Sequence, residues 1–267
     1  MQPTNVGAGF KVSPNVQTLI LGYEPSRDVF AGFDLSTHLG LLGASPSIQI
    51  AESALDAAAE QGLGPHKKAS KEIVFGIGPD LLSTYVRQAA VLHKSGAVAA
   101  DLSLLVNIAA TPDLITPADI DAGASPKRRQ VLQTILRTLR DSRFRTKVLN
   151  AYGLRCGFCG LQLDLLDAAH VLPVSEPLST DLVTNGVAMC VLHHRAYDRG
   201  LITFDTGFAT HHSSDQLGQL AADGRDGGQG AFLSALASKL LGPVRGAHWP
   251  DPGLVKVANI HRGWLLS

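Results

Sequence analysis

The sequence lacks the long apolar runs and the leading segment that would direct a chain into a membrane or across one. No stretch of its 267 residues approaches about 18 uninterrupted apolar residues. Its first residues contain no basic segment followed by an apolar one. We therefore expect no membrane partner, no signal peptide and a cytoplasmic location. Charged residues are few, at 17%, but the hydrophobic fraction of 45% is that of a folded protein and excludes a disordered one.

Cysteine is also scarce, and its distribution excludes one class of scaffold. The three cysteines are Cys156, Cys159 and Cys190. An odd number confined to one short segment argues against a disulfide framework. The sequence instead predicts reduced thiolates that serve as metal ligands.

The length of the chain predicts two compact units, and the pattern of strand-like and helical runs predicts an α+β fold. Residues 1–110 alternate short strand-like runs with helical ones and predict a mixed α/β domain. The expected elements are strands at 16–22, 28–33, 47–50 and 72–77, and helices at 52–61 and 80–93. Three prolines and the loss of apolar periodicity predict a linker at 111–127. The second domain is then expected at 128–267, with a late helix at 231–241 and a strand or turn at 255–266.

The segment from Lys127 to Arg155 is strongly positive, although the formal net charge of the chain is zero. It contains nine basic residues against one acidic residue, Asp141. Apolar residues recur at helical spacing over 128–151 and predict one or two amphipathic helices with arginines on the polar face. Such a face can simply be solvated, but an excess of one sign favours contact with a polyanion.

Two residue pairs form a complete set of zinc ligands. Cys156 and Cys159 are separated by two residues and followed by Gly160, which is typical of a zinc knuckle. Cys190 and His193 repeat that spacing. A closed Cys3His shell predicts a structural zinc ion that stabilises a small domain. The alternatives are three buried cysteines that act as small hydrophobic residues, or a redox protein with a reactive C-x-x-C pair.

Three further polar residues are interleaved with these pairs, and their order resembles a known family. His170, Asn185 and His194 occur in that order, and His194 is followed by Asp198-Arg199-Gly200-Leu201-Ile202 at a spacing of three residues. This arrangement resembles the HNH (ββα-metal) nuclease module, especially the form found in restriction endonucleases. The resemblance covers roughly residues 137–206.

The resemblance implies a role for each of these residues. It implies that His170 is the general base near the end of a first β-strand, and that Asn185 holds the connecting loop and the base. His194 would begin the helix and bind a catalytic Mg²⁺ or Mn²⁺ ion that is distinct from the structural zinc. Asp198 lies one turn after His194 on the same face and is expected to be a second ligand.

The sequence departs from the family pattern at one position. Many members have Asp or His directly before the general base as a metal ligand, whereas this chain has Ala169. Asp167 is expected to lie on the opposite pleat of the strand from His170, so we do not expect it to bind the ion. The ion would then be held by His194, Asp198 and phosphate oxygens of bound DNA.

The resemblance and the positive segment together predict a double-stranded DNA partner. The expected phosphate contacts are Arg137, Arg140, Arg143, Arg145, Arg195 and Arg199. The resemblance implies a DNA endonuclease whose N-terminal domain recognises modified bases, so that modified foreign DNA is restricted. The alternatives are a type II enzyme that recognises unmodified sequence, and a catalytically inactive, zinc-stabilised DNA-binding protein. One site per chain and two strands to cut favour a homodimer.

Overall fold

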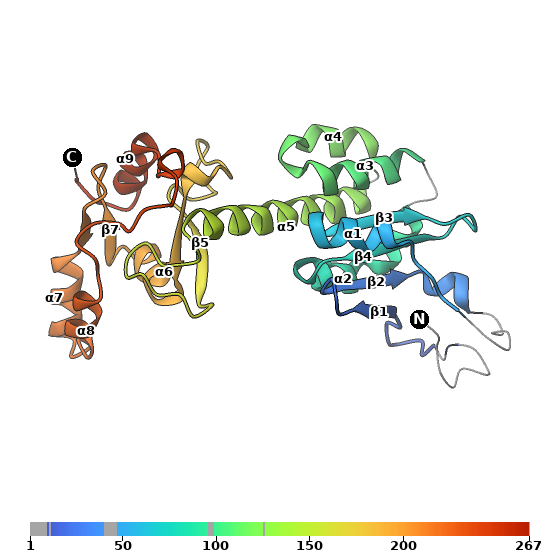
Figure 1. The fold of residues 1–267 in the computed structure, drawn as a ribbon, viewed down its shortest axis with the longest axis horizontal. Helices are drawn as coiled ribbons and strands as arrows, with labels where there is room; N and C mark the ends of the chain where they lie inside the picture. Colours follow the sequence, from blue (N-terminus) through green and yellow to red (C-terminus); the bar gives the residue numbers. More distant parts are fainter. Residues whose placement is uncertain (1–9, 11, 40–46, 96–98, 125, 267) are drawn as a thin grey trace. The chain divides into compact units, whose positions relative to one another are not determined.

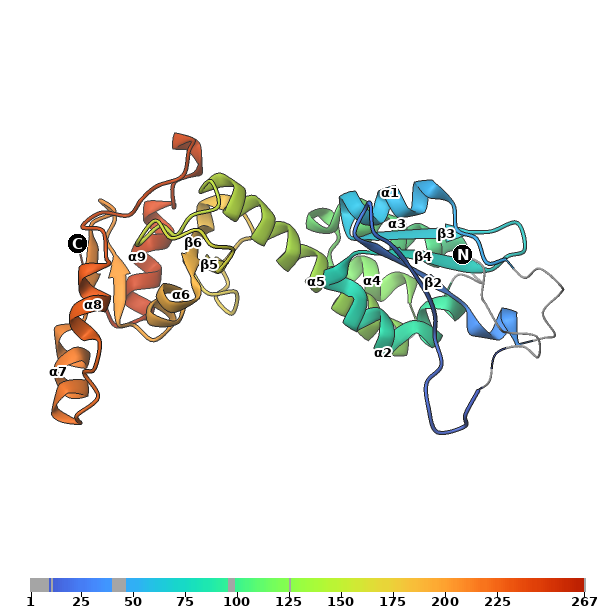
Figure 2. The same ribbon diagram turned by 60° about the horizontal axis from the view of Figure 1, so that its bottom comes forward.

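A computed structural model describes residues 10, 12–39, 47–95, 99–124 and 126–266. The chain divides into two compact units, residues 1–140 and 141–267, and Figures 1 and 2 show the elements of each. No helix within the described ranges is long and apolar enough to cross a membrane. The first nine residues, on which the argument about a signal peptide rests, lie outside the described residues.

The N-terminal unit contains an antiparallel sheet in the order β1-β2-β4-β3. Its strands are β1 (Ile20–Glu24), β2 (Val29–Phe33), β3 (Leu63–Lys67) and β4 (Ile73–Ile77). The expected strands near 16–22, 28–33 and 72–77 are confirmed, but the one expected at 47–50 is wrong because those residues have no regular structure. The sequence did not predict β3, which contains Pro65. Proline is tolerated there because β3 is an edge strand that pairs with β4 alone.

Helices cover both faces of this sheet. They are α1 (Glu52–Gln61), α2 (Pro79–Ser95), α3 (Ala99–Ala110), α4 (Pro117–Gly123) and the long α5 (Pro126–Ala151). A Cβ atom at Gly76 would collide with the Ala54 carbonyl of α1, and one at Gly32 would collide with the Tyr85 ring of α2. Gly32 pairs with Phe75, the neighbour of Gly76, so the two glycines lie on opposite faces. Small residues therefore let α1 and α2 pack closely against opposite sides of the sheet.

The division of the chain differs from the expected linker at 111–127. A short 3-10 turn (Pro112–Leu114) and α4 occupy this stretch instead. The side chain of Thr116 and that of Asp119 form a capping box that starts α4, and Ile120 is fully buried. Residues 111–123 are thus part of the N-terminal unit, and the boundary between the units falls inside α5, after Arg140.

The C-terminal unit is built on an antiparallel strand pair followed by a helix. These elements are β5 (Leu166–His170), β6 (Gly186–Cys190) and α6 (Val191–Asp198), with a 3-10 turn (Val183–Asn185) before β6. Next come β7 (Ile202–Phe204), β8 (Thr210–His212), α7 (Ser214–Ala222), α8 (Gln229–Ser234), a 3-10 turn (Gly246–His248) and α9 (Pro252–His261). The core joins Phe144 and Val148 of α5, and Tyr152 directly after it, to Val187 and Met189 of β6.

Two expectations for the end of the chain are wrong. The helix expected at 231–241 is α8, which ends at Ser234. The strand or turn expected at 255–266 is mostly the helix α9, which Asp251 caps by accepting hydrogen bonds from the backbone N–H groups of Gly253 and Leu254.

Candidate metal centre and nuclease site

The strand pair β5–β6 and helix α6 bring the sequence-predicted residues into one small scaffold. The register pairs Leu166 with Cys190 at one end and His170 with Gly186 at the other. Only glycine fits at 186, since a Cβ atom there would collide with Val148 of α5. The last residue pair of the ladder therefore packs directly against α5.

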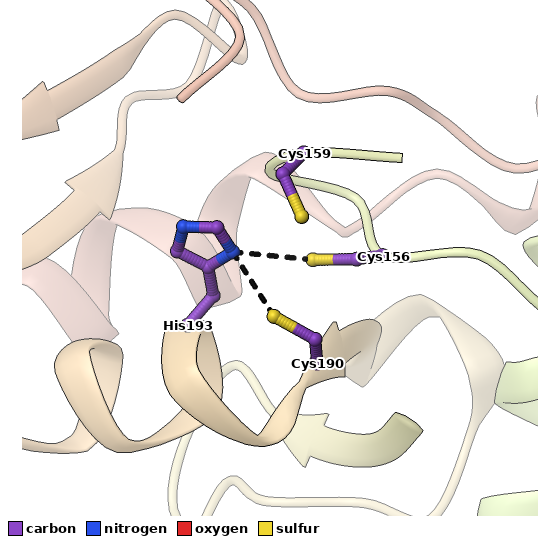
Figure 3. A group of neighbouring side chains, drawn as sticks. All are labelled: Cys156, Cys159, Cys190 and His193. Atoms are coloured by element: carbon purple, nitrogen blue, oxygen red, sulfur yellow. Dashed lines mark hydrogen bonds between the residues drawn. The ribbon is translucent and has the colours of Figure 1, made fainter. Parts of the chain in front are cut away.

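Cys156, Cys159, Cys190 and His193 form a compact cluster, as the zinc prediction requires. One ligand atom from each residue lies within 4.8 Å of the others. The Nδ1 atom of His193 is 3.5 Å from the Cys156 sulfur and 3.2 Å from the Cys190 sulfur, and Figure 3 shows all four side chains pointing to one centre. The Nε2 atom of His193 is buried, and no partner for it is found among the described residues. Nδ1 is therefore the nitrogen that faces the thiol groups.

Burial shifts the protonation equilibria of all four residues in this cluster. Burial raises the pKa of the Cys156, Cys159 and Cys190 thiols and lowers that of the His193 ring. Burial alone thus favours four neutral groups, whereas a bound divalent cation favours thiolates and neutral imidazole, which are the forms that bind metal. Three sulfurs and one nitrogen at this spacing fit tetrahedral zinc.

Backbone hydrogen bonds build the knuckle that presents the first two cysteines. The N–H of Gly160 donates to the Cys156 carbonyl over 2.8 Å, and Gly160 has φ +74°, a left-handed conformation that glycine adopts without strain. The N–H of Gly157 donates to the Ala188 carbonyl over 2.8 Å, which attaches the knuckle to β6. The metal cluster is therefore part of the same scaffold as the strand pair.

His170 ends β5 between an aromatic ring and a carboxylate. The Phe144 ring of α5 stacks on the imidazole with the ring centroids 3.8 Å apart and an angle of 10° between the planes. The Nε2 atom of His170 lies 3.1 Å from Oδ1 of Asp181. The side chain is 14% exposed, so its ring is oriented by two neighbours yet remains accessible at an edge.

Asn185 is fully buried, and its side-chain amide binds the segment that follows His170. Its Oδ1 accepts a hydrogen bond from the N–H of Leu172 over 2.8 Å. Its Nδ2 donates to the carbonyls of Leu172 and Thr180 and to Oγ of Ser179, over 3.2, 2.9 and 3.1 Å. The backbone of Asn185 also accepts from the N–H of Val171 over 2.9 Å. The loop between β5 and β6 is therefore closed around this one amide.

His194 lies between two carboxylates, one of which the sequence argument set aside. Its Nδ1 is 3.5 Å from Oδ2 of Asp167, and its Nε2 is 3.6 Å from Oδ2 of Asp198. Asp167 is on the opposite pleat from His170, as expected, but α6 brings His194 to that side of the strand. An imidazole with an aspartate at each nitrogen can hold one divalent ion through one nitrogen and one carboxylate, with the other carboxylate orienting the ring.

The structure thus forms three separate sets of contacts from the predicted residues: the Cys3His cluster, the His194 carboxylates, and His170 with its neighbours. Asp181 is a functional candidate that sequence reasoning missed, and Asp167 is one that it set aside. Asp167 had a usable signal, because the residues of a strand that face away from the base face a helix packed behind it. Asp181 had none, because it lies in an irregular loop.

The predicted phosphate contacts have unlike environments. Arg140 donates to the backbone carbonyls of Pro112 and Ile115 within the N-terminal unit, and Arg145 donates to the Leu166 carbonyl over 2.7 Å. Arg195 on α6 and Arg199, which caps the end of that helix, are exposed and line an open pocket of about 650 Å³. The bonds of Arg140 show that at least part of its side chain serves the fold, whereas the exposed Arg195 and Arg199 remain suited to an anion.

Comparisons with known proteins bear on both units. Residues 1–86 match the family described as Methylase-associated X1, and residues 156–205 match HNH endonuclease. No curated protein matches the chain. Among solved structures, the chain is similar to "Modification dependent TagI restriction endonuclease", with a TM-score of 0.30 and 17% identity over 45% of this chain and 37% of that one. The chain thus spans little more than a third of that protein. Because the segment 156–205 contains β5, β6, α6 and all four residues of the Cys3His cluster, the chain carries an HNH endonuclease module.

Proposed function

We propose that this protein is a DNA endonuclease that hydrolyses phosphodiester bonds with one divalent ion and with His170 as the general base. The observation that supports it most is the match of residues 156–205 to HNH endonucleases, over a strand pair and helix that hold His170 and His194 and a 3-10 turn that ends at Asn185. The contacts described above give each of these three residues neighbours that suit the role implied by the resemblance.

The neighbours of His170 support the role of a base. If Asp181 accepts the proton on Nε2, the imidazole is fixed in the tautomer whose Nδ1 has a free lone pair. That lone pair can take a proton from an attacking water. Stacking on Phe144 limits rotation of the ring, and Asn185 holds the backbone that follows it.

The pair of carboxylates around His194 supports a site for a divalent ion. We assign His194, through Nε2, and Asp198 as ligands, and Asp167 as the carboxylate that orients the ring, because each carboxylate faces one ring nitrogen. A bound Mg²⁺ or Mn²⁺ ion would neutralise charge that develops on the phosphate. Arg195 on the same helix and Arg199 at its end would bind neighbouring phosphates and hold the strand in place.

The N-terminal unit is the proposed site of target recognition. Its first 86 residues match a family described as methylase-associated, which supports a link to DNA modification. We propose that this unit reads modified bases in foreign DNA, and that two chains act together because each has one cutting site. A type II enzyme that reads unmodified sequence is the alternative within this class.

A cleavage assay on matched modified and unmodified duplexes, with Mg²⁺ or Mn²⁺, tests the proposal. We expect wild-type protein to cut the modified duplex and His170→Ala to cut neither, with unchanged zinc content and nearly unchanged DNA affinity. Equal cutting of both duplexes would favour a type II enzyme that recognises unmodified sequence. DNA binding without cutting under any condition would favour the inactive DNA-binding protein, which Ala169 makes worth testing.

A further inference from the structure

Helix α9 lies outside the segment that matches HNH endonucleases, yet it is bonded to that segment at both ends and in the middle. The backbone N–H of Asp251, its cap, donates to the Thr184 carbonyl over 2.8 Å. In the middle, the buried Asn259 accepts from Oγ1 of Thr203 over 2.6 Å and donates to the Phe204 carbonyl over 2.9 Å. After its last turn, Arg262 donates from Nη1 to the Val171 carbonyl over 2.7 Å.

Of these contacts, the one that Arg262 makes lies next to His170, the proposed general base. Val171 follows His170 directly, at the point where the ladder between β5 and β6 ends. Its N–H is already engaged by the Asn185 carbonyl, over 2.9 Å. Its own carbonyl is buried and accepts hydrogen bonds from Arg262 and, over 3.3 Å, from the Tyr197 hydroxyl. Both polar groups of Val171 are therefore fixed by residues distant in the sequence.

Arg262 is itself held in place. Its guanidinium carbon lies 4.2 Å from the centroid of the Tyr197 ring, which is buried in the core of the C-terminal unit. A cation above an aromatic face and a charge-assisted hydrogen bond both favour one geometry of this side chain. The residue therefore links α9, helix α6 and the end of β5 through one planar group.

From these contacts we propose that Arg262 is a positioning residue for His170. Helix α9, which leads into Arg262, then contributes to the nuclease activity of the C-terminal unit. The inference rests on the proposed function of His170. Arg262 does not touch the reacting atoms in this account; it fixes the peptide that sets where the imidazole lies. A catalytic group misplaced by about 1 Å can cost on the order of 100-fold in rate.

The test compares three full-length variants with the wild type. Arg262→Met removes the charge and keeps an apolar side chain, whereas Arg262→Lys keeps a cation that can donate a hydrogen bond. Lys256→Met is the matched control, because it removes a charge from the exposed side of α9. In DNA cleavage with Mg²⁺ we expect kcat to fall about 10- to 100-fold for Arg262→Met with KM within about 2-fold. Arg262→Lys should recover part of that loss, and the control should match the wild type.

A second readout does not depend on cutting. The ring resonance of His170 in an NMR spectrum, identified by its absence from His170→Ala, should shift in Arg262→Met and remain in place in Lys256→Met. Tyr197→Phe, which removes the other donor to Val171 and keeps the ring, should give a smaller shift in the same resonance.

Three results would overturn the inference: an unchanged kcat in Arg262→Met, a rise in KM alone, which would make Arg262 a DNA contact, or an unmoved His170 resonance. If the wild type fails to cut any DNA, the proposed function fails, while the NMR comparison still decides whether Arg262 positions the ring. Zinc content measured on each variant separates these effects from loss of the fold.

Discussion

Replacing Asn185 with alanine should destabilise the C-terminal unit by a large and calculable amount. The side chain is fully buried and makes four hydrogen bonds, three of them to backbone groups of Leu172 and Thr180. A hydrogen bond contributes about 0.5–1.5 kcal/mol net, and a buried partner left unsatisfied costs more. We therefore expect Asn185→Ala to lower the free energy of unfolding by about 2–5 kcal/mol.

Urea unfolding followed by tryptophan fluorescence measures this change without interference from the other unit. Both tryptophans of the chain, Trp249 and Trp264, belong to the C-terminal unit. Ser179→Ala is the matched control at a half-buried site, because it removes one partner of Asn185 together with the hydrogen bond from Ser179 to the Leu172 carbonyl, and it should cost about 1–2 kcal/mol. If Asn185→Ala unfolds within about 0.5 kcal/mol of the wild type, the amide does not hold the loop as described.

Three further changes test other parts of the molecule. Cys159→Ser removes one of the four proposed zinc ligands, and metal analysis of the purified protein should show the loss of the stoichiometric zinc that we expect in the wild type; full zinc content in the variant would contradict the Cys3His assignment. Asp167→Asn should raise the Mn²⁺ concentration for half-maximal cleavage by about 10-fold or more, and an unchanged requirement would exclude Asp167 from the ion site. Burial raises the pKa of Glu72, but hydrogen bonds from Lys68 and His38 outweigh it and lower that pKa below 4.5. The ion pairs therefore stabilise the fold above about pH 4.5 and are lost as the pH falls through the lowered pKa. In thermal unfolding followed by circular dichroism, the wild type should have a higher midpoint temperature than Glu72→Gln at pH 7, and this difference should shrink towards pH 3. A difference that stays constant would contradict this.

Local patterns predicted the metal cluster well because the information is local. The spacing within Cys156-x2-Cys159 and Cys190-x2-His193 is set by tight turns, so the sequence alone defines a four-residue ligand set that the structure brings within 4.8 Å. The sequence also predicted helical structure over 128–151, because apolar residues recur there over several turns. Helix α5 covers that range.

Prolines bear on two helices that the sequence analysis did not predict. Pro117 is one of the three prolines that predicted a linker at 111–127, yet it occupies the first turn of α4, where its missing N–H costs nothing, and Pro252 occupies the same position in α9. The caps that precede them, Thr116 and Asp251, were visible in the sequence. A capping residue followed by proline should therefore have predicted a helix at both places.

The remaining site residues were beyond sequence reasoning for a different reason. Arg262 and Val171 are 91 residues apart, and Asp181 lies in a loop with no periodic pattern. Contacts of this kind arise from how helices and loops pack in three dimensions, and no spacing rule encodes them. Asp167 differs from these two, because strand alternation places it on the face of β5 opposite His170, where α6 brings His194.

A crystal structure of His170→Ala with an uncleaved DNA duplex and Mn²⁺ would show whether His170 and His194 serve one phosphodiester, since anomalous scattering locates the ion. We expect manganese bound to His194, one phosphodiester bound to that ion, and the same phosphodiester next to position 170. Manganese bound elsewhere, or a phosphodiester at the ion with position 170 turned away from it, would contradict the claim that these two histidines serve a single cut.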